Sequence, residues 1–374
     1  MKKIGIIVIL FVISTLQLYS QIAPKYSNAA FALGVGARSL GLGNAVAASV
    51  NDVTSAYWNP AGLCKIEQQV EGSLMHAEYF AGLTKYDYLG AAFRPDAQSV
   101  IAFSVLRLGV DDIQNTINLF DSNGNIDYNR IENFSVADYA FLFSYSKKTK
   151  IEGLNIGANA KIIYRNYGKF AKAYGFGIDL GAQYAKNKWL FGAMAYDITN
   201  TFNVWTFNEK ELNPTVIDTI LNEIPENSLE MTLPRIVPSV AREFQLSEKV
   251  GLLAEFDAVI TFDGKRNTVV SSNFASINPQ MGIELNYMKI IYLRIGAGNM
   301  QQIEEFEYNA STTEEIDNVV IKEKWAIQPN AGIGLKFRNI SIDYAFTDIG
   351  SQVVMYSNVF SLKYSFSSQR NTIN

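Results

Sequence analysis

The sequence predicts an all-β membrane protein, an antiparallel, up-and-down transmembrane β-barrel of about 14 strands with a small-residue helical plug in its lumen. Three observations predict this class. Apolar and polar residues alternate over segments of about ten to twelve residues, every long connection follows an odd-numbered segment, and a stretch rich in glycine, alanine and serine precedes the first segment.

The composition differs from that of an ordinary soluble protein. Apolar residues make up 48% and aromatic residues 13%, whereas only 18% are charged and about 25% is usual. After the first 20 residues, charges or prolines interrupt every apolar run, so we expect no transmembrane helix. A net charge of −4 offers no electrostatic footprint for nucleic acid, so we expect no nucleic-acid partner.

The first 20 residues are typical of a secretory signal peptide. Lys2 and Lys3 form a basic start, Ile4 to Leu16 is an apolar run shorter than a membrane span, and cleavage is expected before Gln21. We therefore predict four parts, namely a signal peptide (1–20), an N-terminal plug or hatch (21–66), a barrel (67–366) and a C-terminal tail (367–374).

The clearest alternation runs from Tyr174 to Tyr184, where every second residue is apolar and the residues between are glycine or polar. Strands of a soluble β-sandwich also alternate, but they average about five to six residues. A tilted strand needs about nine to eleven residues to cross a bilayer. Many of these segments also carry Tyr, Phe or Trp at one end of the apolar face, as an outer-membrane barrel does.

Fourteen segments are predicted to be strands. They are Gln68 to Tyr79, Thr84 to Arg94, Gln98 to Gly109, Phe134 to Lys147, Glu152 to Asn166, Ala173 to Ala185, Lys188 to Asp197, Arg235 to Leu246, Lys249 to Ile260, Ile277 to Tyr287, Ile290 to Gly298, Trp325 to Phe337, Asn339 to Phe346 and Asn358 to Phe366.

The connections test this count, because odd and even connections of an up-and-down barrel lie at opposite rims. The long connections all follow odd-numbered segments, and the connections after even-numbered segments are short turns. This parity places the long loops on the outside and the tight turns in the periplasm. The long ones are Val110 to Asn133, Ile198 to Pro234, Thr261 to Ser276, Asn299 to Lys324 and Thr347 to Ser357.

The small-residue stretch from Leu33 to Leu63 is the predicted plug. We expect a short helix that begins at Ser39 or Asn44 and ends at Val50, and Asn59-Pro60 then ends any helix. Taken alone, the stretch also fits a segment that caps a soluble domain. The barrel pattern favours the plug, since 14 strands leave a lumen too wide for side chains alone to fill.

The polar face of the strands is expected to line the lumen. Charges of both signs lie there, and we expect them to pair lumen wall with plug, the alternative being a substrate path. The predicted residues are Lys161, Arg165, Asp179, Glu255, Asp257, Glu284, Arg294 and Asp343.

The plug resembles the N-terminal signature of the PorV/PorQ family, itself similar to the FadL family of outer-membrane transporters. The resemblance rests on GARSLGLGNAVAASVNDVTSAYWNPAGL, from Gly36 to Leu63, and extends loosely over the mature chain. It implies a hatch inside a barrel in the outer membrane of a Gram-negative bacterium. The corresponding hatch residues are Gly41, Gly43, Asn44, Asn51, Asp52, Asn59, Pro60, Ala61 and Gly62.

The resemblance leaves two functions open. The first is a non-enzymatic part in type IX protein secretion, in which external loops bind translocon or cargo through Phe202, Trp205 and Phe207. The alternative is FadL-like transport of hydrophobic small molecules, with a hydrophobic ligand and a lateral opening at Pro238 or Pro329. Outer-membrane lipid surrounds the barrel in both.

No catalytic site, cofactor or metal site is expected. His76 is the only histidine and is predicted to lie in a strand, so it forms neither a metal cluster nor a catalytic triad. Cys64 is the only cysteine, which excludes an internal disulfide, and we expect it to be buried beside the plug.

Overall fold

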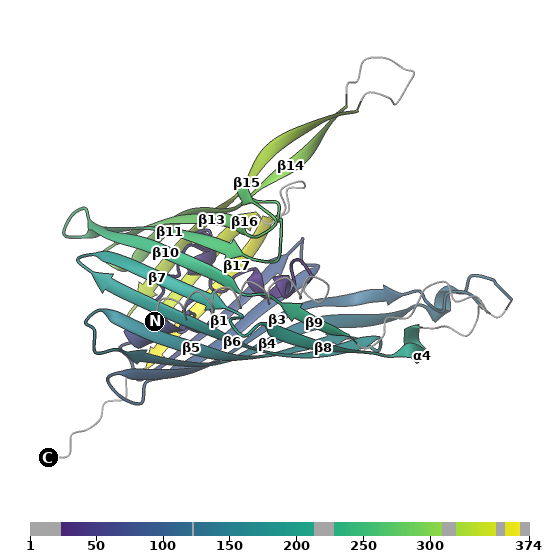
Figure 1. The fold of residues 1–374 in the computed structure, drawn as a ribbon, viewed down its shortest axis with the longest axis horizontal. Helices are drawn as coiled ribbons and strands as arrows, with labels where there is room; N and C mark the ends of the chain where they lie inside the picture. The colour runs from purple at the N-terminus through teal and green to yellow at the C-terminus, as the bar shows by residue number, and fades with distance from the viewer. Residues whose placement is uncertain (1–23, 122, 213–227, 309–318, 349–355, 367–374) are drawn as a thin grey trace, which may run out of the picture.

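The chain folds into a closed antiparallel β-barrel (Figure 1). The structure is a computed structural model that describes residues 24–121, 123–212, 228–308, 319–348 and 356–366. The last strand pairs with the first, which closes the sheet, and Glu71 lies opposite Ser365 in this pairing. The predicted signal peptide (1–20) and tail (367–374) lie outside the described residues.

Fourteen strands form the wall, as the sequence predicts. In order around the barrel they are β1 (Val70–Tyr79), β2 (Thr84–Phe93), β3 (Ser99–Asn115), β4 (Glu132–Lys148), β5 (Leu154–Tyr167), β6 (Ala171–Lys186), β7 (Trp189–Tyr196), β10 (Arg235–Gln245), β11 (Val250–Thr261), β13 (Ser276–Tyr287), β14 (Ile291–Tyr308), β15 (Val319–Phe337), β16 (Ile340–Asp348) and β17 (Tyr356–Phe366). Long connections leave one end of the barrel and short turns the other (Figure 1).

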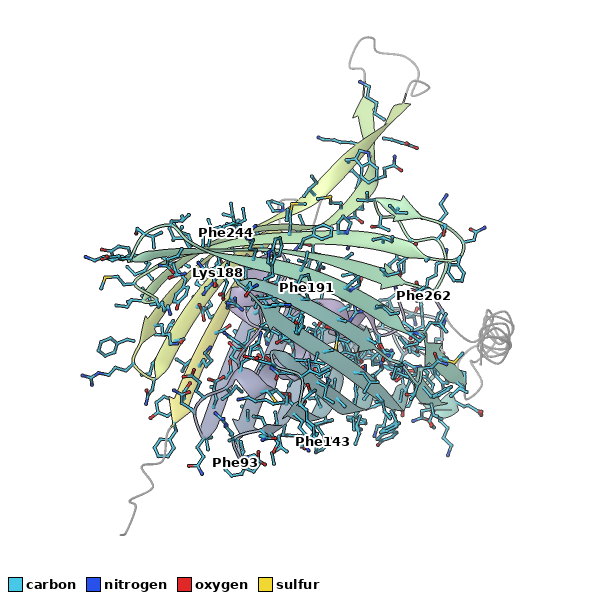
Figure 2. All side chains as sticks on the ribbon, turned by 60° about the vertical axis from the view of Figure 1, so that its left-hand side comes forward. Phe93, Phe143, Lys188, Phe191, Phe244 and Phe262 are labelled. Carbon is cyan, nitrogen blue, oxygen red and sulfur yellow. The ribbon has the colours of Figure 1, made fainter. Side chains whose placement is uncertain are left out.

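The alternation places apolar side chains outside and polar side chains inside. In β6, Tyr174 is 62% exposed on the outer surface, whereas Asp179 is 2% exposed in the lumen. Phe93, Phe143, Phe191 and Phe244 all lie exposed on the outer wall (Figure 2). In an outer-membrane barrel, the lipid acyl chains contact an apolar outer band of this kind.

Several strands extend further than predicted. β3 continues past Gly109 to Asn115, and β14 past Gly298 to Tyr308, where with β15 it forms an arm beyond the barrel (Figure 1). The expected ends were wrong because apolar alternation is required only where a strand meets lipid. Above the membrane, backbone pairing extends the hairpin without that pattern.

The predicted loop from Ile198 to Pro234 is also corrected. It contains β8 (Thr201–Phe207), which continues along β6 where β7 ends, and β9 (Leu229–Thr232), which pairs with β8. Another predicted loop, Thr261 to Ser276, contains β12 (Val270–Ser271). Two further short helices, η4 (Tyr128–Arg130) and α4 (Glu209–Leu212), lie in long connections.

The hatch is a chain of single helical turns inside the barrel. It comprises η2 (Ala29–Ala32), α2 (Ala37–Gly41), α3 (Ser55–Trp58) and η3 (Pro60–Lys65). The expected helix from Ser39 or Asn44 to Val50 was wrong, because Gly43 and Asn44 both have positive φ (64° and 69°) and turn the chain after α2. No helix within the described ranges is long and apolar enough to span a membrane.

Candidate functional site

Glycines of the wall form the seat on which the hatch rests. A Cβ added to Gly157 of β5 would come within 2.4 Å of the carbonyl carbon of Pro60, and one on Gly296 of β14 within 2.1 Å of that of Leu42. Only glycine allows backbone to approach this closely. Similar contacts with the hatch occur at Gly181, Gly192, Gly282 and Gly332.

Asn59 joins the hatch to itself and to the wall. Its side-chain Oδ1 accepts from the backbone N–H of Ala61 at 3.2 Å, which caps η3, and Pro60 occupies the first position of that turn. Its Nδ2 donates to the carbonyls of Ala47 (2.9 Å) and Ala182 in β6 (3.0 Å). The Asn-Pro-Ala element is therefore the point at which two hatch segments and one strand meet.

Two carboxylates of β11 bind four consecutive hatch amides. Asp257 accepts from the N–H groups of Val46 and Ala47, both at 3.0 Å. Glu255 accepts from those of Ala48 (2.8 Å) and Ser49 (3.2 Å). These N–H groups are satisfied in the lumen by the wall, since no regular helix or strand supplies partners there.

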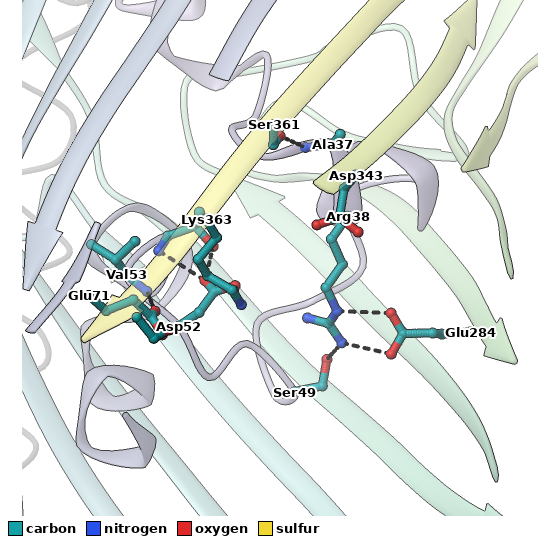
Figure 3. A network of polar contacts seen from close by, with 12 residues as sticks. Ala37, Arg38, Ser49, Asp52, Val53, Glu71, Glu284, Asp343, Ser361 and Lys363 are labelled. Carbon is teal, nitrogen blue, oxygen red and sulfur yellow. Dashed lines mark hydrogen bonds and ion pairs between the residues drawn. The ribbon is translucent and has the colours of Figure 1, made fainter. Parts of the chain in front are cut away.

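A buried ion-pair network fixes α2 (Figure 3). Arg38 of the hatch pairs through Nε with Glu284 of β13 at 2.9 Å. The same carboxylate accepts from Arg294 of β14 at 2.6 Å, and Arg294 reaches Asp343 of β16 at 2.6 Å. Every charge in the network has an opposite partner, which burial requires.

A second ion pair holds the other side of the hatch (Figure 3). Lys363 of β17 lies 2.8 Å from Asp52, and Glu71 of β1 accepts from the N–H of Val53 at 2.8 Å. Burial alone raises the pKa of Asp52, but the Lys363 ammonium outweighs burial and holds this pKa below its usual range. Asp52 therefore remains ionised.

The remaining predicted lumen cations also have partners. Lys161 lies between Asp179 (3.1 Å) and Asp197 (2.6 Å). Arg165 lies 3.6 Å from Glu230 of β9 and donates to Asn28 of the hatch. All eight predicted lumen residues are thus inside the barrel, where they bind hatch or neighbouring wall.

The other predicted hatch residues differ in their surroundings. Gly43 lies against Ala297 and Gly62 against the carbonyl of Val50, both closely enough to exclude a larger residue. A Cβ on Gly41 would be 3.1 Å from the Cα of Gly332, which is a tight contact. Asn44 donates to the carbonyl of Leu33 at 3.3 Å. Asn51 is exposed and lines a cavity at the short-turn end.

A cavity of about 80 Å³ separates the hatch from the wall on the long-loop side. By volume it has room for several waters or one small molecule. The hatch contributes Phe31 and Tyr57, and the wall contributes apolar side chains of Leu106, Ala140, Leu142 and Ile163. Tyr57 donates its hydroxyl to the carbonyl of Phe31, and burial raises its pKa, so this wall of the cavity stays uncharged.

The same cavity reaches an interruption of the barrel wall. Tyr196 pairs with Arg235 and Thr201 with Thr232, but between these pairs four residues (197–200) face only Leu233 and Pro234. Leu233 and Pro234 line the cavity. Pro234 has no N–H to donate, which prevents regular pairing. Of the prolines singled out in the sequence, Pro329 pairs with Ala297 of β14. Pro238 pairs with Ala193 of β7, but on its other side the β10–β11 ladder skips Val237 and Pro238.

The three aromatics predicted to contact a partner do not share a face. Phe202 of β8 is 41% exposed on the outer surface. Trp205 is buried on the inner side, contacts Tyr167 edge to face, and donates through Nε1 to Glu230 at 2.7 Å. Phe207 packs against the buried cluster around Trp205.

Sequence reasoning missed several partners in these contacts, because Arg38, Glu71 and Asp197 were not among the predicted residues. Arg38 of the hatch pairs with Glu284, and Asp197 of the wall pairs with Lys161. Glu71 of the wall accepts from the Ser365 hydroxyl and from the N–H of Val53. The useful signal was that Arg38 is the only basic residue in the small-residue stretch from Leu33 to Leu63. Among the described residues, His, Cys, Asp and Glu form no group of three or more that could hold a metal ion.

Comparison with known proteins places this geometry in a structural class. No protein-family model matches the chain, and no curated protein matches it. Among solved structures, the toluene transporter TodX of Pseudomonas putida has a TM-score of 0.52 at 12% identity, covering 90% of this chain and 99% of TodX. This chain shares the fold of these barrels.

Two further structures agree. The monoaromatic hydrocarbon channel CymD has a TM-score of 0.52 at 13% identity, covering 90% of this chain and 98% of CymD. The toluene transporter TbuX of Ralstonia pickettii has a TM-score of 0.50 at 11% identity, covering 89% and 98%. At such identities the likeness concerns the fold. A closed 14-stranded barrel with an apolar outer face is an outer-membrane protein of a Gram-negative bacterium, so the predicted location is confirmed.

Proposed function

We propose that this chain transports small hydrophobic molecules across the outer membrane. The observation that carries the proposal is the cavity between hatch and wall, which is lined on one side by aliphatic side chains and ends at the interrupted wall beside Leu233 and Pro234. A hydrophobic molecule gains free energy when it leaves water for such a lining. The barrels of the same fold that are described as toluene transporters and as a monoaromatic hydrocarbon channel support this choice over secretion.

The cavity combines apolar walls with a few fixed polar groups, as ligand sites do. Leu106, Leu142 and Ile163 form the apolar side. At the opposite side Arg235 stacks on the ring of Tyr196 at 4.2 Å, and Lys161 is already neutralised by two aspartates. A compact molecule with a flat apolar body fits this arrangement.

The route that we propose uses the interrupted wall. A molecule dissolved in the outer leaflet would enter between residues 197–200, which join β7 to β8, and Leu233 and Pro234, which join β9 to β10, because the ladder of hydrogen bonds is already broken there. Movement of the hatch would then open the path toward the periplasm. The ion pairs and carboxylate contacts that fix the hatch set the free-energy cost of that movement.

Binding of toluene to the purified barrel tests the proposal. Ala140 lines the cavity and faces inward, so Ala140→Phe fills the space and should abolish toluene binding measured by saturation-transfer NMR. Phe143 lies on the same strand and faces lipid, so Phe143→Leu is the matched control and should bind as the wild type does. Heat-modifiable electrophoretic mobility shows that each variant is folded. Unchanged binding by a folded Ala140→Phe barrel would reject the cavity as the site.

A part in type IX secretion remains the second candidate. The observation in its favour is the outward apolar face of β8, where Phe202 and Val204 are exposed on an extension of the barrel beyond the membrane. Trp205 is engaged inside the barrel and is better placed to hold β8 and β9 together. If Phe202→Ser and Val204→Ser leave secretion of signal-bearing cargo intact in a host with that pathway, this candidate fails.

A further inference from the structure

The short-turn end of the barrel contains a second cavity, with a volume of about 580 Å³. Its roof is the hatch, which contributes Arg38, Ser49 and Lys65, and its sides are the ends of the strands and the short turns. Unlike the first cavity, it is lined mainly by polar and charged side chains. By the orientation of the barrel, this cavity opens to the periplasm.

The charges of this cavity are unbalanced. The chain as a whole has a net charge of −4, but eight basic side chains and only five acidic ones line the cavity. The deeper charges pair with one another, because Arg38, Arg294 and Lys363 are matched by carboxylates in the networks described above. The excess of positive charge therefore lies at the outer part of the cavity.

Four cations form this outer ring, which we call the basic mouth: Lys188, Lys289, Lys336 and Arg338. Within the described part of the chain none of the four forms an ion pair with a carboxylate, and Lys65 of the hatch roof donates to the carbonyl of Ala48. Glu67 and Glu243 are the acidic side chains at the same level. A cleft lined by one sign of charge attracts molecules of the opposite sign.

The mouth cations line the cavity at its rim. Lys188 and Lys336 lie next in sequence to Trp189 and Phe337, which are exposed on the outer surface and do not line the cavity. Arg338 lies at the outer edge of the mouth, 5.3 Å from the centre of the Phe337 ring. Figure 2 shows Lys188 at this end of the barrel close to Phe244.

A hydrophobic molecule that passes the hatch enters this polar, charged space. There it loses the stabilisation of the first cavity, so onward movement requires an acceptor. We propose that the basic mouth docks an acidic, soluble periplasmic protein that receives the transported molecule. This inference rests on the proposed transport of hydrophobic molecules, and its docking step is tested separately from ligand binding.

The test uses the whole barrel in nanodiscs of phosphatidylcholine and a fluorescent peptide of about 20 glutamates as the probe. Fluorescence anisotropy should show binding that weakens as salt is added. The variant Lys188→Gln, Lys289→Gln, Lys336→Gln, Arg338→Gln should weaken binding by about tenfold or more, because cations that act together are removed. The control Lys147→Gln, Lys148→Gln, Lys150→Gln changes cations at the same end of the barrel that do not line the cavity, and should change binding about twofold at most.

Three results would overturn the proposal. The first is equal weakening by both sets of variants, which would mean unspecific attraction to the rim. The second is displacement of the peptide by hexanoate at concentrations at which chloride of the same ionic strength does not displace it, which would mean that the mouth binds the carboxylate of a transported acid. The third is loss of peptide binding when phosphatidylglycerol is added to the nanodisc, which would assign the cations to anionic lipid. Toluene binding by the same samples reports on the transport proposal independently.

Discussion

Pro60 of the hatch lies so close to Gly157 of β5 that a methyl group on Gly157 would be 2.4 Å from the Pro60 carbonyl carbon and 2.5 Å from the Ala61 nitrogen. Both contacts involve backbone, which has no rotamer with which to move aside. The fit of the hatch in the barrel therefore depends on a wall residue that has no side chain.

The first prediction follows from this contact. Gly157→Ala should displace the Asn-Pro-Ala element and loosen η3, which increases hydrogen exchange of the amides of residues 59–65. Gly72 of β1 is the matched control, because a Cβ there would have its nearest neighbour at an ordinary 3.7 Å. Hydrogen exchange followed by mass spectrometry distinguishes the two. Equal protection in both variants would show that the seat tolerates a side chain.

The second prediction concerns the pair Lys363 and Asp52. Lys363→Met leaves a buried carboxylate without its cation and should destabilise the hatch by about 3 to 5 kcal/mol. The double variant Lys363→Met, Asp52→Asn should recover much of this loss, because no uncompensated charge remains. Proteolysis of the hatch in folded barrels measures both. A double variant as labile as the single one would contradict the electrostatic explanation.

The pH dependence of this pair has a definite sign. In the wild type the folded pKa of Asp52 is below its usual value of 3.8, so its contribution is complete above about pH 4 and is lost as the pH falls further. In Lys363→Met, burial raises the pKa of Asp52, so hatch stability should instead decrease as the pH rises from about 4 to 7. Proteolysis rates over that range check the reversal.

The third prediction addresses the four amides held by β11. Asp257→Asn replaces a charged acceptor by an amide that has one acceptor oxygen, so the contacts to Val46 and Ala47 weaken by about 1.5 to 3 kcal/mol. Exchange of the amides of residues 46–49 should increase selectively. Glu243→Gln in β10 is a suitable control, since Glu243 is exposed. An equal effect of both changes would rule out the specific contact.

The fold could be predicted from the sequence because the bilayer imposes a strict rule on each residue of a spanning strand. Tyr174 and Asp179 belong to opposite faces, and the structure places them outside and inside as the alternation requires. The residues at which β3 and β14 end could not be predicted, since that rule no longer applies beyond the membrane. The number of strands was therefore more predictable than their length.

Less of the candidate site than of the fold could be predicted from the sequence. The wall charges could be assigned to the lumen from the alternation, but their partners could not, because Arg38 and Glu284 are 246 residues apart. The cavity depends on how η2 and Tyr57 sit against β3 to β5, which is tertiary packing that no local pattern encodes. The interruption at Pro234 was missed for the same reason, since a proline is informative only when the strand opposite it is known.

The central claim is that hydrophobic molecules cross the membrane through the cavity beside Ala140. It is tested most directly by the initial rate of radiolabelled toluene uptake in cells that lack their own transporter and produce the wild type, Ala140→Phe or Phe143→Leu. The account predicts faster uptake with the wild type and with Phe143→Leu, and a return to the background rate with Ala140→Phe. Background uptake with a folded wild-type barrel, or equal uptake with Ala140→Phe, would contradict it.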